Sequence, residues 1–310
     1  MSPLSKACSF IALSASTAAA IHQGPLKIDV DGETLEMHVV SSAEKGQLFR
    51  TDDRTLMMNW GGETRGFLAA RETDDYSASM WFNFTLLNKE LSYDADLSKV
   101  GCSCNAALFF VSMPGYNPDG SVARGVDQNP FYCDANDIGG VWCWEHDTIE
   151  ANKFNVQTAP HTCDSAPGQY IDVCDKRGCS SNAYSENEHG LCPDEKCTID
   201  TRKPFRIFQS YNGNADGQLV TIANTFVQEG REFSWDACPK SEYLAQMTAA
   251  IGGKMTMTFQ LWGTTEEKMK FLDENLCTGE CIPEETEASF SNIAIKSLHQ
   301  RLEKGEELIV

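Results

Sequence analysis

The chain has few cations and no long apolar run after its first twenty residues. It contains 25 Lys and Arg against 45 Asp and Glu, so its formal net charge is −20 and its pI is near 4.6. Such a surface repels nucleic acid and anionic membranes, and we expect neither as a partner. A membrane-spanning helix needs roughly eighteen consecutive apolar residues, and none follow the N-terminus. The sequence also lacks a glycine-rich nucleotide motif and a closed Cys/His zinc spacing, so we expect no cofactor and no metal.

Helical periodicity is also scarce. It occurs only in 240–251, 266–274 and the tail 295–308. Elsewhere short runs alternate between apolar and polar residues and are broken by Gly, Asn and Pro, which is typical of strands. The predicted strands include 80–96, 106–113, 205–211, 218–227 and 254–262. This pattern predicts an all-β fold, a β-sandwich of curved antiparallel sheets with long disulfide-held loops and a few short helices.

The N-terminus has the order of a secretory signal peptide. Lys6 is followed by an apolar run and then by Ala18-Ala19-Ala20. We therefore expect residues 1–20 to be a signal peptide, 21–300 a single catalytic domain and 301–310 a C-terminal tail. The mature protein is expected to be extracellular and to act as a monomer.

The number of cysteines also indicates an extracellular protein. Of the 13 in the chain, removal of the signal peptide takes Cys8 and leaves an even set, which in an exported protein indicates up to six disulfides. Seven of them lie between Cys133 and Cys197, in a segment with little periodicity that disulfides should hold. Connectivity does not follow from the spacing. The sequon Asn83-Phe84-Thr85 suggests a glycoprotein.

The most informative stretch is Glu-x-Asp-x-x-Glu, formed by Glu145, Asp147 and Glu150. In a strand, Glu145 and Asp147 share a face while Glu150 falls on the other. One extra residue, a β-bulge, would bring all three to one side. Carboxylates so close repel each other, so at least one should keep its proton near neutral pH, as in a glycosidase. The spacing alone favours an acidic surface strand that binds nothing, or a calcium site, over a glycosidase.

Several further segments occur in an order that resembles glycoside hydrolase family 7, the cellobiohydrolases and endoglucanases. The resemblance covers roughly residues 65–295. Its segments are Phe84-Thr85-Leu86-Leu87, 91–96, 105–113, Tyr132-Cys133-Asp134, 145–152, Pro160-His161-Thr162-Cys163, 198–205, Leu261-Trp262 and 290–293. The Glu-x-Asp-x-x-Glu motif followed by Pro-His-x-Cys is the most specific part. The family fold is a β-sandwich jelly roll whose concave face holds a β-1,4-glucan chain.

By this resemblance Glu145 is the nucleophile, Glu150 is the general acid/base, and Asp147 hydrogen-bonds and orients Glu145. The implied reaction is retaining hydrolysis through a covalent glycosyl-enzyme. Five more positions match substrate-binding residues of the family. They are His161 beside the leaving group, Asn105 and Phe109 on the substrate face, Trp262 as a sugar-stacking platform, and Phe271 where a second Trp is usual.

The resemblance also implies disulfides. Cys133 and Cys143 are expected to pair because a neighbouring family disulfide is lost with its loop. Cys102 and Cys104 are expected to pair with Cys277 and Cys281 in an undetermined order. The remaining implied pairs are Cys163–Cys192, Cys174–Cys179 and Cys197–Cys238.

Departures from the family concern the surroundings of the motif. A loop after Asp134 is short, and a segment between Cys197 and Thr198 that normally carries an arginine near the leaving group is absent. His146 and Thr148 replace apolar neighbours. We therefore expect a secreted endo-β-1,4-glucanase with an open cleft and a β-glucan partner. The alternatives are a non-catalytic glycan-binding or effector protein, or a hydrolase of mixed-linkage or β-1,3-glucan.

Overall fold

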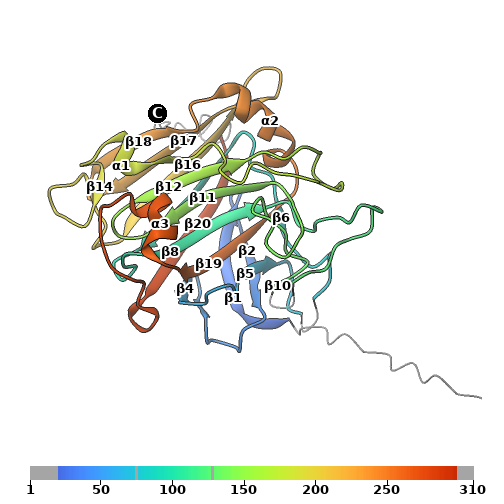
Figure 1. Ribbon diagram of the computed structural model, residues 1–310, viewed down its shortest axis with the longest axis horizontal. Coiled ribbons are helices and arrows are strands. Elements are labelled where there is room, and N and C mark those ends of the chain that lie inside the picture. Colours follow the sequence, from blue (N-terminus) through green and yellow to red (C-terminus); the bar gives the residue numbers. More distant parts are fainter. Residues whose placement is uncertain (1–19, 74–75, 127–128, 299–310) are drawn as a thin grey trace, which may run out of the picture.

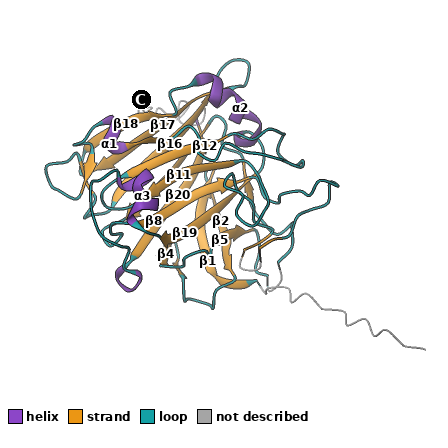
Figure 2. Cartoon of the chain, in the orientation of Figure 1, coloured by secondary structure: helices purple, strands orange, loops and turns teal. Residues whose placement is uncertain are grey.

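The computed structural model describes residues 20–73, 76–126 and 129–298, and strands dominate them (Figures 1 and 2). The helical elements are α1 (Ala183–Glu186), α2 (Ser241–Ile251), α3 (Glu266–Asp273) and the 3₁₀ turn η1 (Pro283–Glu285). The strands are β1 (Ile21–Val30), β2 (Glu33–Ser41), β3 (Phe49–Asp52), β4 (Thr55–Asn59), β5 (Gly66–Ala69), β6 (Asn83–Phe84), β7 (Lys89–Asp96), β8 (Cys104–Val111), β9 (Gly125–Val126), β10 (Asn129–Pro130), β11 (Glu145–Ala151), β12 (Val156–His161), β13 (Ser181–Asn182), β14 (Leu191–Cys192), β15 (Ile199–Asp200), β16 (Phe205–Gly213), β17 (Leu219–Gln228), β18 (Arg231–Ala237), β19 (Met255–Gly263) and β20 (Glu287–Ser297).

One long curved sheet forms the scaffold. Its order is β13-β12-β11-β8-β19-β5-β2-β1-β20-β7-β16-β17-β18. The sheet folds over so that β12, β11, β8 and β19 make one layer and β20, β7, β16 and β17 make the other (Figure 1). The two layers meet through a buried interior, where for example the rings of Phe259 in β19 and Phe290 in β20 lie 6.4 Å apart. The β-sandwich predicted from the alternating pattern is confirmed.

Period-two alternation explains why these segments form strands. In β16 every second residue is buried, beginning with Phe205 and Ile207, while the residues between them are partly exposed. In β19 the apolar residues Met255, Met257, Phe259 and Leu261 face the interior and leave the polar residues between them for the other face. Among the residues described, no helix is both long and apolar enough to cross a membrane.

The other predicted strands and two of the three predicted helices are confirmed within a residue or two, but the strand predicted over 80–96 is divided by a turn into β6 (Asn83–Phe84) and β7 (Lys89–Asp96). The third, 295–308, is wrong for residues 295–297, because Ile295 lies in β20 and pairs with Leu91 of β7 and Val30 of β1. Leu298, the last described residue, is helical as predicted. Ile293 and Ile295 are both buried, so this tail has the period of a strand. Residues 299–310 lie outside the described part of the chain, as do residues 1–19 of the expected signal peptide.

Six disulfides join the twelve cysteines from Cys102 onward. Cys133–Cys143 is confirmed, and the undetermined set resolves into Cys102–Cys277 and Cys104–Cys281. These last two fasten the start of β8 to the loop after α3. The expected pairs Cys163–Cys192, Cys174–Cys179 and Cys197–Cys238 are wrong.

The fold brings other sulfurs together. Cys163 and Cys174 face each other across an antiparallel bridge, with Cα atoms 4.0 Å apart, and form one disulfide. Cys192 and Cys197 close the loop between β14 and β15. Cys179 is held beside β12 by a backbone bond from its N–H to Pro160 O, and it pairs with Cys238 at the end of β18.

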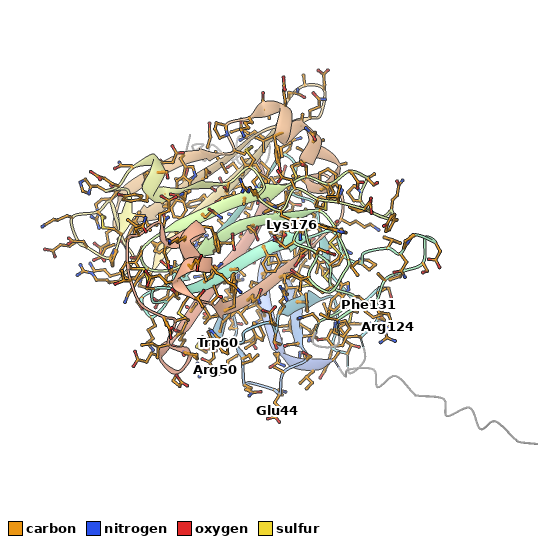
Figure 3. All side chains as sticks on the ribbon, in the orientation of Figure 1. Glu44, Arg50, Trp60, Arg124, Phe131 and Lys176 are labelled. Atoms are coloured by element: carbon orange, nitrogen blue, oxygen red, sulfur yellow. A yellow bond between two sulfur atoms is a disulfide. The ribbon has the colours of Figure 1, made fainter. Side chains whose placement is uncertain are left out.

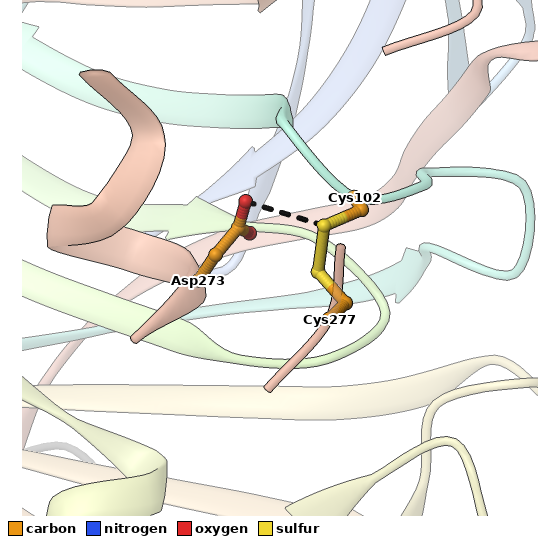
Figure 4. Close-up of side chains that lie close together, drawn as sticks. All are labelled: Cys102, Asp273 and Cys277. Atoms are coloured by element: carbon orange, nitrogen blue, oxygen red, sulfur yellow. Dashed lines mark hydrogen bonds between the residues drawn. A yellow bond between two sulfur atoms is a disulfide. The ribbon is translucent and has the colours of Figure 1, made fainter. Parts of the chain in front are cut away.

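Buried Asp273 attaches α3 to the catalytic layer. Its carboxylate accepts hydrogen bonds from the Asn152 side chain, at 2.6 Å, and from the backbone N–H of Ser103, at 2.9 Å. It also lies beside the Cys102–Cys277 disulfide, with Cys102 Sγ 3.5 Å from Asp273 Oδ2 (Figure 4). Burial raises the pKa of Asp273. This junction fixes α3 over the end of β11.

Candidate active site

Strand β11 contains the predicted β-bulge. Glu145 and Asp147 pair with His161 and Ala159 of β12, but Glu150 pairs with Gln157, so one extra residue is inserted between them. The same shift occurs against β8, between Asp147 and Ile149. As a result Glu145, Asp147 and Glu150 all line one cavity of about 740 Å³. The spacing argument from the sequence is confirmed.

Glu145 lies at the base of this cavity and is 4% exposed. Its Oε2 accepts a hydrogen bond of 3.0 Å from the backbone N–H of Ala135. Burial raises the pKa of Glu145, and the negative charges of Asp147 and Asp134 raise it further. The positive charge of His161 and the Ala135 N–H act in the opposite direction and favour the carboxylate.

Asp147 is paired with His161. His161 Nε2 lies 3.0 Å from Asp147 Oδ2, and its Nδ1 lies 2.8 Å from Asp175 O. Burial by itself would lower the pKa of His161, but the hydrogen bond and charge of Asp147 outweigh it and raise the pKa to about 10. Both ring nitrogens then carry protons and donate. The expected hydrogen bond between Asp147 and Glu145 stays a prediction; one ligand atom from each of Glu145, Asp147 and His161 lies within 4.8 Å of the other two.

Glu150 is held by two side-chain amides. Asn105 Nδ2 donates to Oε1 at 2.8 Å, and Gln157 Nε2 donates to Oε2 at 3.2 Å. Burial, and then the charge of Asp147, raise the pKa of Glu150 to about 8. At neutral pH this carboxyl group therefore carries a proton that it can donate into the cavity.

The predicted binding residues divide into two groups. Phe109, His161, Trp262 and Phe271 line the cavity. The rings of Trp262 and Phe271 are nearly parallel, at 17°, with centroids 6.5 Å apart. Asn105, expected on the substrate face, is fully buried and does not line the cavity. It fixes Glu150 with its amide and accepts the backbone N–H of Ala151 with its oxygen.

Residues that sequence reasoning missed complete the walls. Gln157 lies four residues before His161 in β12, so strand parity could have placed it on the same face. Arg65 packs over the ring of Tyr132 and lies 3.9 Å from Asp134, a contact between distant segments that no spacing reveals. Lys176, labelled in Figure 3, and Arg177 come from the loop after Cys174.

Two clusters of residues combine types that bind metals. The ligand atoms of Glu145, Asp147 and His161 lie within 4.8 Å of one another. Calcium prefers six to eight oxygen ligands, and a set of two carboxylates and an imidazole suits it poorly. The second cluster is Cys102, Asp273 and Cys277. Its sulfurs form a disulfide and cannot act as thiolate ligands.

The raised pKa values of Glu150 and His161 predict that the free energy of unfolding falls as the pH rises from 6.5 to 8. In this range the folded protein keeps protons on Glu150 and His161, whose pKa values are about 8 and about 10. The unfolded chain has lost the Glu150 proton throughout this range and loses the His161 proton as the pH rises above its ordinary pKa of 6.5. Each proton that only the folded protein retains therefore lowers the free energy of unfolding by up to about 1.4 kcal/mol per pH unit. Below pH 6.5 the trend is opposed, because burial lowers the pKa of His146 to about 4.

Urea denaturation at several pH values between 6.5 and 8 measures this slope. The variant Glu150→Gln, which cannot bind the proton, should show a smaller slope. A stability that is constant or increases with pH in this window would contradict the assignment.

Comparison with known proteins agrees with this geometry. A family model described as "Glycosyl hydrolase family 7" matches residues 30–138 and 126–243. The chain is 31% identical over 239 residues to "Endoglucanase EG-1" of Trichoderma longibrachiatum, covering 67% of this chain and 49% of that protein. It is 28% identical over 252 residues to "Probable endo-beta-1,4-glucanase celB" of Aspergillus fumigatus, covering 68% and 60%. The chain thus spans about half to three-fifths of the length of these relatives.

Solved structures show the same fold at low sequence identity. An endocellulase Cel7B from Humicola insolens matches with a TM-score of 0.71 at 19% identity, over 90% of this chain and 98% of that one. A cellobiohydrolase from Daphnia pulex matches with a TM-score of 0.68 at 18% identity, over 92% and 98%.

Proposed function

The chain belongs to glycoside hydrolase family 7, and on that premise we propose that it is a secreted, retaining hydrolase that cleaves internal β-1,4-glucosidic bonds of cellulose-like glucans. The observation that carries the proposal is the bulge in β11. It places two carboxyl groups with different surroundings, Glu145 and Glu150, on one wall of a cavity. Relatives named endoglucanases support the substrate class.

The proposed first step uses the two groups together. Glu150 donates its proton to the glycosidic oxygen while Glu145 attacks the anomeric carbon, which gives a glycosyl-enzyme and releases the leaving sugar. Glu145 must be ionised for this attack. The imidazolium of His161 and the N–H of Ala135 favour its charged form, and so does the positive charge that develops on the sugar in the transition state.

In the second step Glu150, now a carboxylate, takes a proton from water, which attacks the anomeric carbon and frees Glu145. Two inversions leave the β configuration unchanged. Asp147 contributes through His161, because the ion pair holds a positive charge next to Glu145. Asn105 and Gln157 keep the Glu150 carboxyl group in one orientation throughout.

The two sides of the cavity have different chemistry. In the sheet β12 and β13 lie on one side of β11, and β8 and β19 lie on the other. The β19 side presents Gln260 and Trp262, which suits stacking of a sugar ring. The β12 side carries Lys176 and Arg177, whose side chains are exposed and can donate hydrogen bonds to sugar hydroxyls. A glucan chain that crosses the strands would contact both.

We expect the wild-type protein to release reducing ends from amorphous cellulose and carboxymethylcellulose. Internal cleavage should lower the viscosity of carboxymethylcellulose before many reducing ends appear, and NMR should show the β anomer of the product first. The same assays are also run on mixed-linkage glucans and on β-1,3-glucans. Activity on β-1,3-glucan alone would overturn the linkage, and slow loss of viscosity with short chain-end products would overturn internal cleavage. Binding without release on every glycan would favour a glycan-binding protein.

A further inference from the structure

The bulge in β11 leaves backbone groups that the strand ladder does not satisfy. Thr148 and Ile149 together stand opposite the single residue Thr158 of β12, and the register with β8 skips Thr148, whose hydroxyl donates to Leu108 O of that strand at 2.6 Å. An unpaired buried carbonyl is rare in folded proteins, so the partners of Thr148 are informative. Thr148 is 2% exposed, which leaves water little access to it.

Side chains of the interior take over these bonds. The carbonyl oxygen of Thr148 accepts Thr158 Oγ1 at 3.0 Å and Gln209 Nε2 at 3.3 Å. Gln209 Nε2 also donates to Asn224 Oδ1 at 2.6 Å, and Asn224 Nδ2 donates to Thr158 Oγ1 at 3.1 Å. The bonds form a closed ring in which each donor has an acceptor. We call Thr148, Thr158, Gln209 and Asn224 the bracing network.

Gln209 connects the two layers of the sandwich at this point. It lies in β16, in the layer opposite β11, and is fully buried. Its Oε1 accepts His146 Nε2 at 3.0 Å and also the hydroxyl of Tyr211. Gln209 therefore contacts β11 on both sides of Asp147, through the side chain of His146 and the carbonyl of Thr148.

We infer that Gln209, supported by Asn224 and Thr158, is a positioning residue that fixes the bulge of β11 and thereby the placement of Glu150 relative to Glu145. A regular strand would turn Glu150 towards the interior, so the geometry of the site depends on where the extra residue is inserted. Buried polar networks with every member satisfied specify one arrangement. This inference rests on the proposed function for its kinetic consequences, but not for its structural ones.

The test replaces Gln209 by Met, which keeps the length of the side chain and removes both polar ends, and Thr158 by Val. Matched controls are Gln228→Met and Thr225→Val. Gln228 is also a buried amide, but it bonds backbone groups of Asp200, Lys203 and Pro204, away from the cavity. Thr225 is a buried hydroxyl that bonds Ser234.

We expect Gln209→Met to lower kcat on an unactivated β-1,4-glucan about 10- to 100-fold with little change in KM, as for a small displacement of a reacting group. A 2,4-dinitrophenyl β-cellobioside needs little acid assistance, so glycosylation of the enzyme by it should fall much less. The alkaline limb of the pH profile should also move, because it reports the surroundings of Glu150. The two controls should leave all three readouts unchanged.

Amide hydrogen exchange supplies a measurement that does not depend on activity. Residues 145–151 should exchange faster in Gln209→Met than in wild type, and not in Gln228→Met. The inference is overturned if exchange in this segment is the same in Gln209→Met and Gln228→Met. It is also overturned if Gln209→Met loses no more activity than Gln228→Met on either substrate. If wild type hydrolyses no glucan, the proposed function fails and the exchange measurement alone decides the inference.

Discussion

Replacing Glu145 by Gln is expected to abolish glucan hydrolysis. The substitution keeps the size of the side chain and its place in the register with His161, but an amide cannot form the glycosyl ester. Removal of a nucleophile typically costs at least about 10³-fold in kcat. The measurement is release of reducing sugar from carboxymethylcellulose, with binding followed separately by calorimetry. Binding should persist, because Trp262, Phe271 and the polar walls are unchanged.

A matched control tests whether loss of any carboxylate from the cavity would be enough to abolish hydrolysis. Glu63 also lines the cavity, but it is exposed and does not lie on β11 with the three carboxyl groups of the motif. Glu63→Gln should therefore retain most of the wild-type kcat. Equal activity in wild type and Glu145→Gln would remove Glu145 from the mechanism.

Azide can test the role of Glu145 more directly. In Glu145→Ala a small anion can enter the space of the missing carboxylate and attack an activated β-glycoside from that side. One inversion gives the α-glycosyl azide. A β-glycosyl azide from this variant would instead assign Glu145 to the acid/base role.

Replacing Glu150 by Gln is the second change with a large expected effect. General acid catalysis typically contributes about 10²- to 10⁴-fold, so kcat on unactivated glucans should fall within that range. With a 2,4-dinitrophenyl β-cellobioside the leaving group needs no proton. The first step should then survive and the glycosyl-enzyme should accumulate as a burst, because water lacks its base in the second step.

The pH dependence of kcat/KM tests the role of Glu150 independently. Glu150 works as an acid only while it is protonated, and burial together with the charge of Asp147 raises its pKa to about 8. The wild-type kcat/KM for glucan should therefore decrease as the pH rises through about 8. Glu150→Gln should lose this alkaline limb. A limb of unchanged position in the variant would show that another group causes it.

The difference between the two carboxyl groups originates in their neighbours. Glu145 receives a backbone N–H from Ala135 and faces the His161 imidazolium, whereas Glu150 receives only neutral amides. Neutral amides stabilise a carboxylate less than a cation does. Burial raises the pKa of both carboxyl groups, and the charge of His161 opposes that rise at both, so the Ala135 N–H is the contact that distinguishes Glu145.

Several features of the site could be predicted from the sequence because they depend on local order. The spacing of Glu145, Asp147 and Glu150, together with the two-residue period of a strand, required a bulge, and the bulge is present. The polar alternation from residue 254 to 262 likewise placed Trp262 on the cavity side. In the tail, by contrast, Ile295 was predicted to begin a helix because a short apolar pattern fits either period.

Other features depend on which distant segments meet, and spacing carries no such information. Three of the implied disulfides are wrong, because the fold brings Cys163 to Cys174, Cys192 to Cys197 and Cys179 to Cys238. Asn105, expected to contact substrate, is fully buried and bonds the Glu150 carboxyl group and the backbone of Ala151 in the neighbouring strand.

The sequence by itself determined which carboxyl groups share one face of the strand, because carboxylate identity and strand parity are properties of adjacent residues. Only the tertiary structure decided which groups surround those carboxyl groups. His161 pairs with Asp147, Gln157 supports Glu150 and Gln209 reaches the bulge from the opposite layer. Each of these contacts forms between strands that only the folded sandwich brings together, and burial there is what raises the pKa of Glu150.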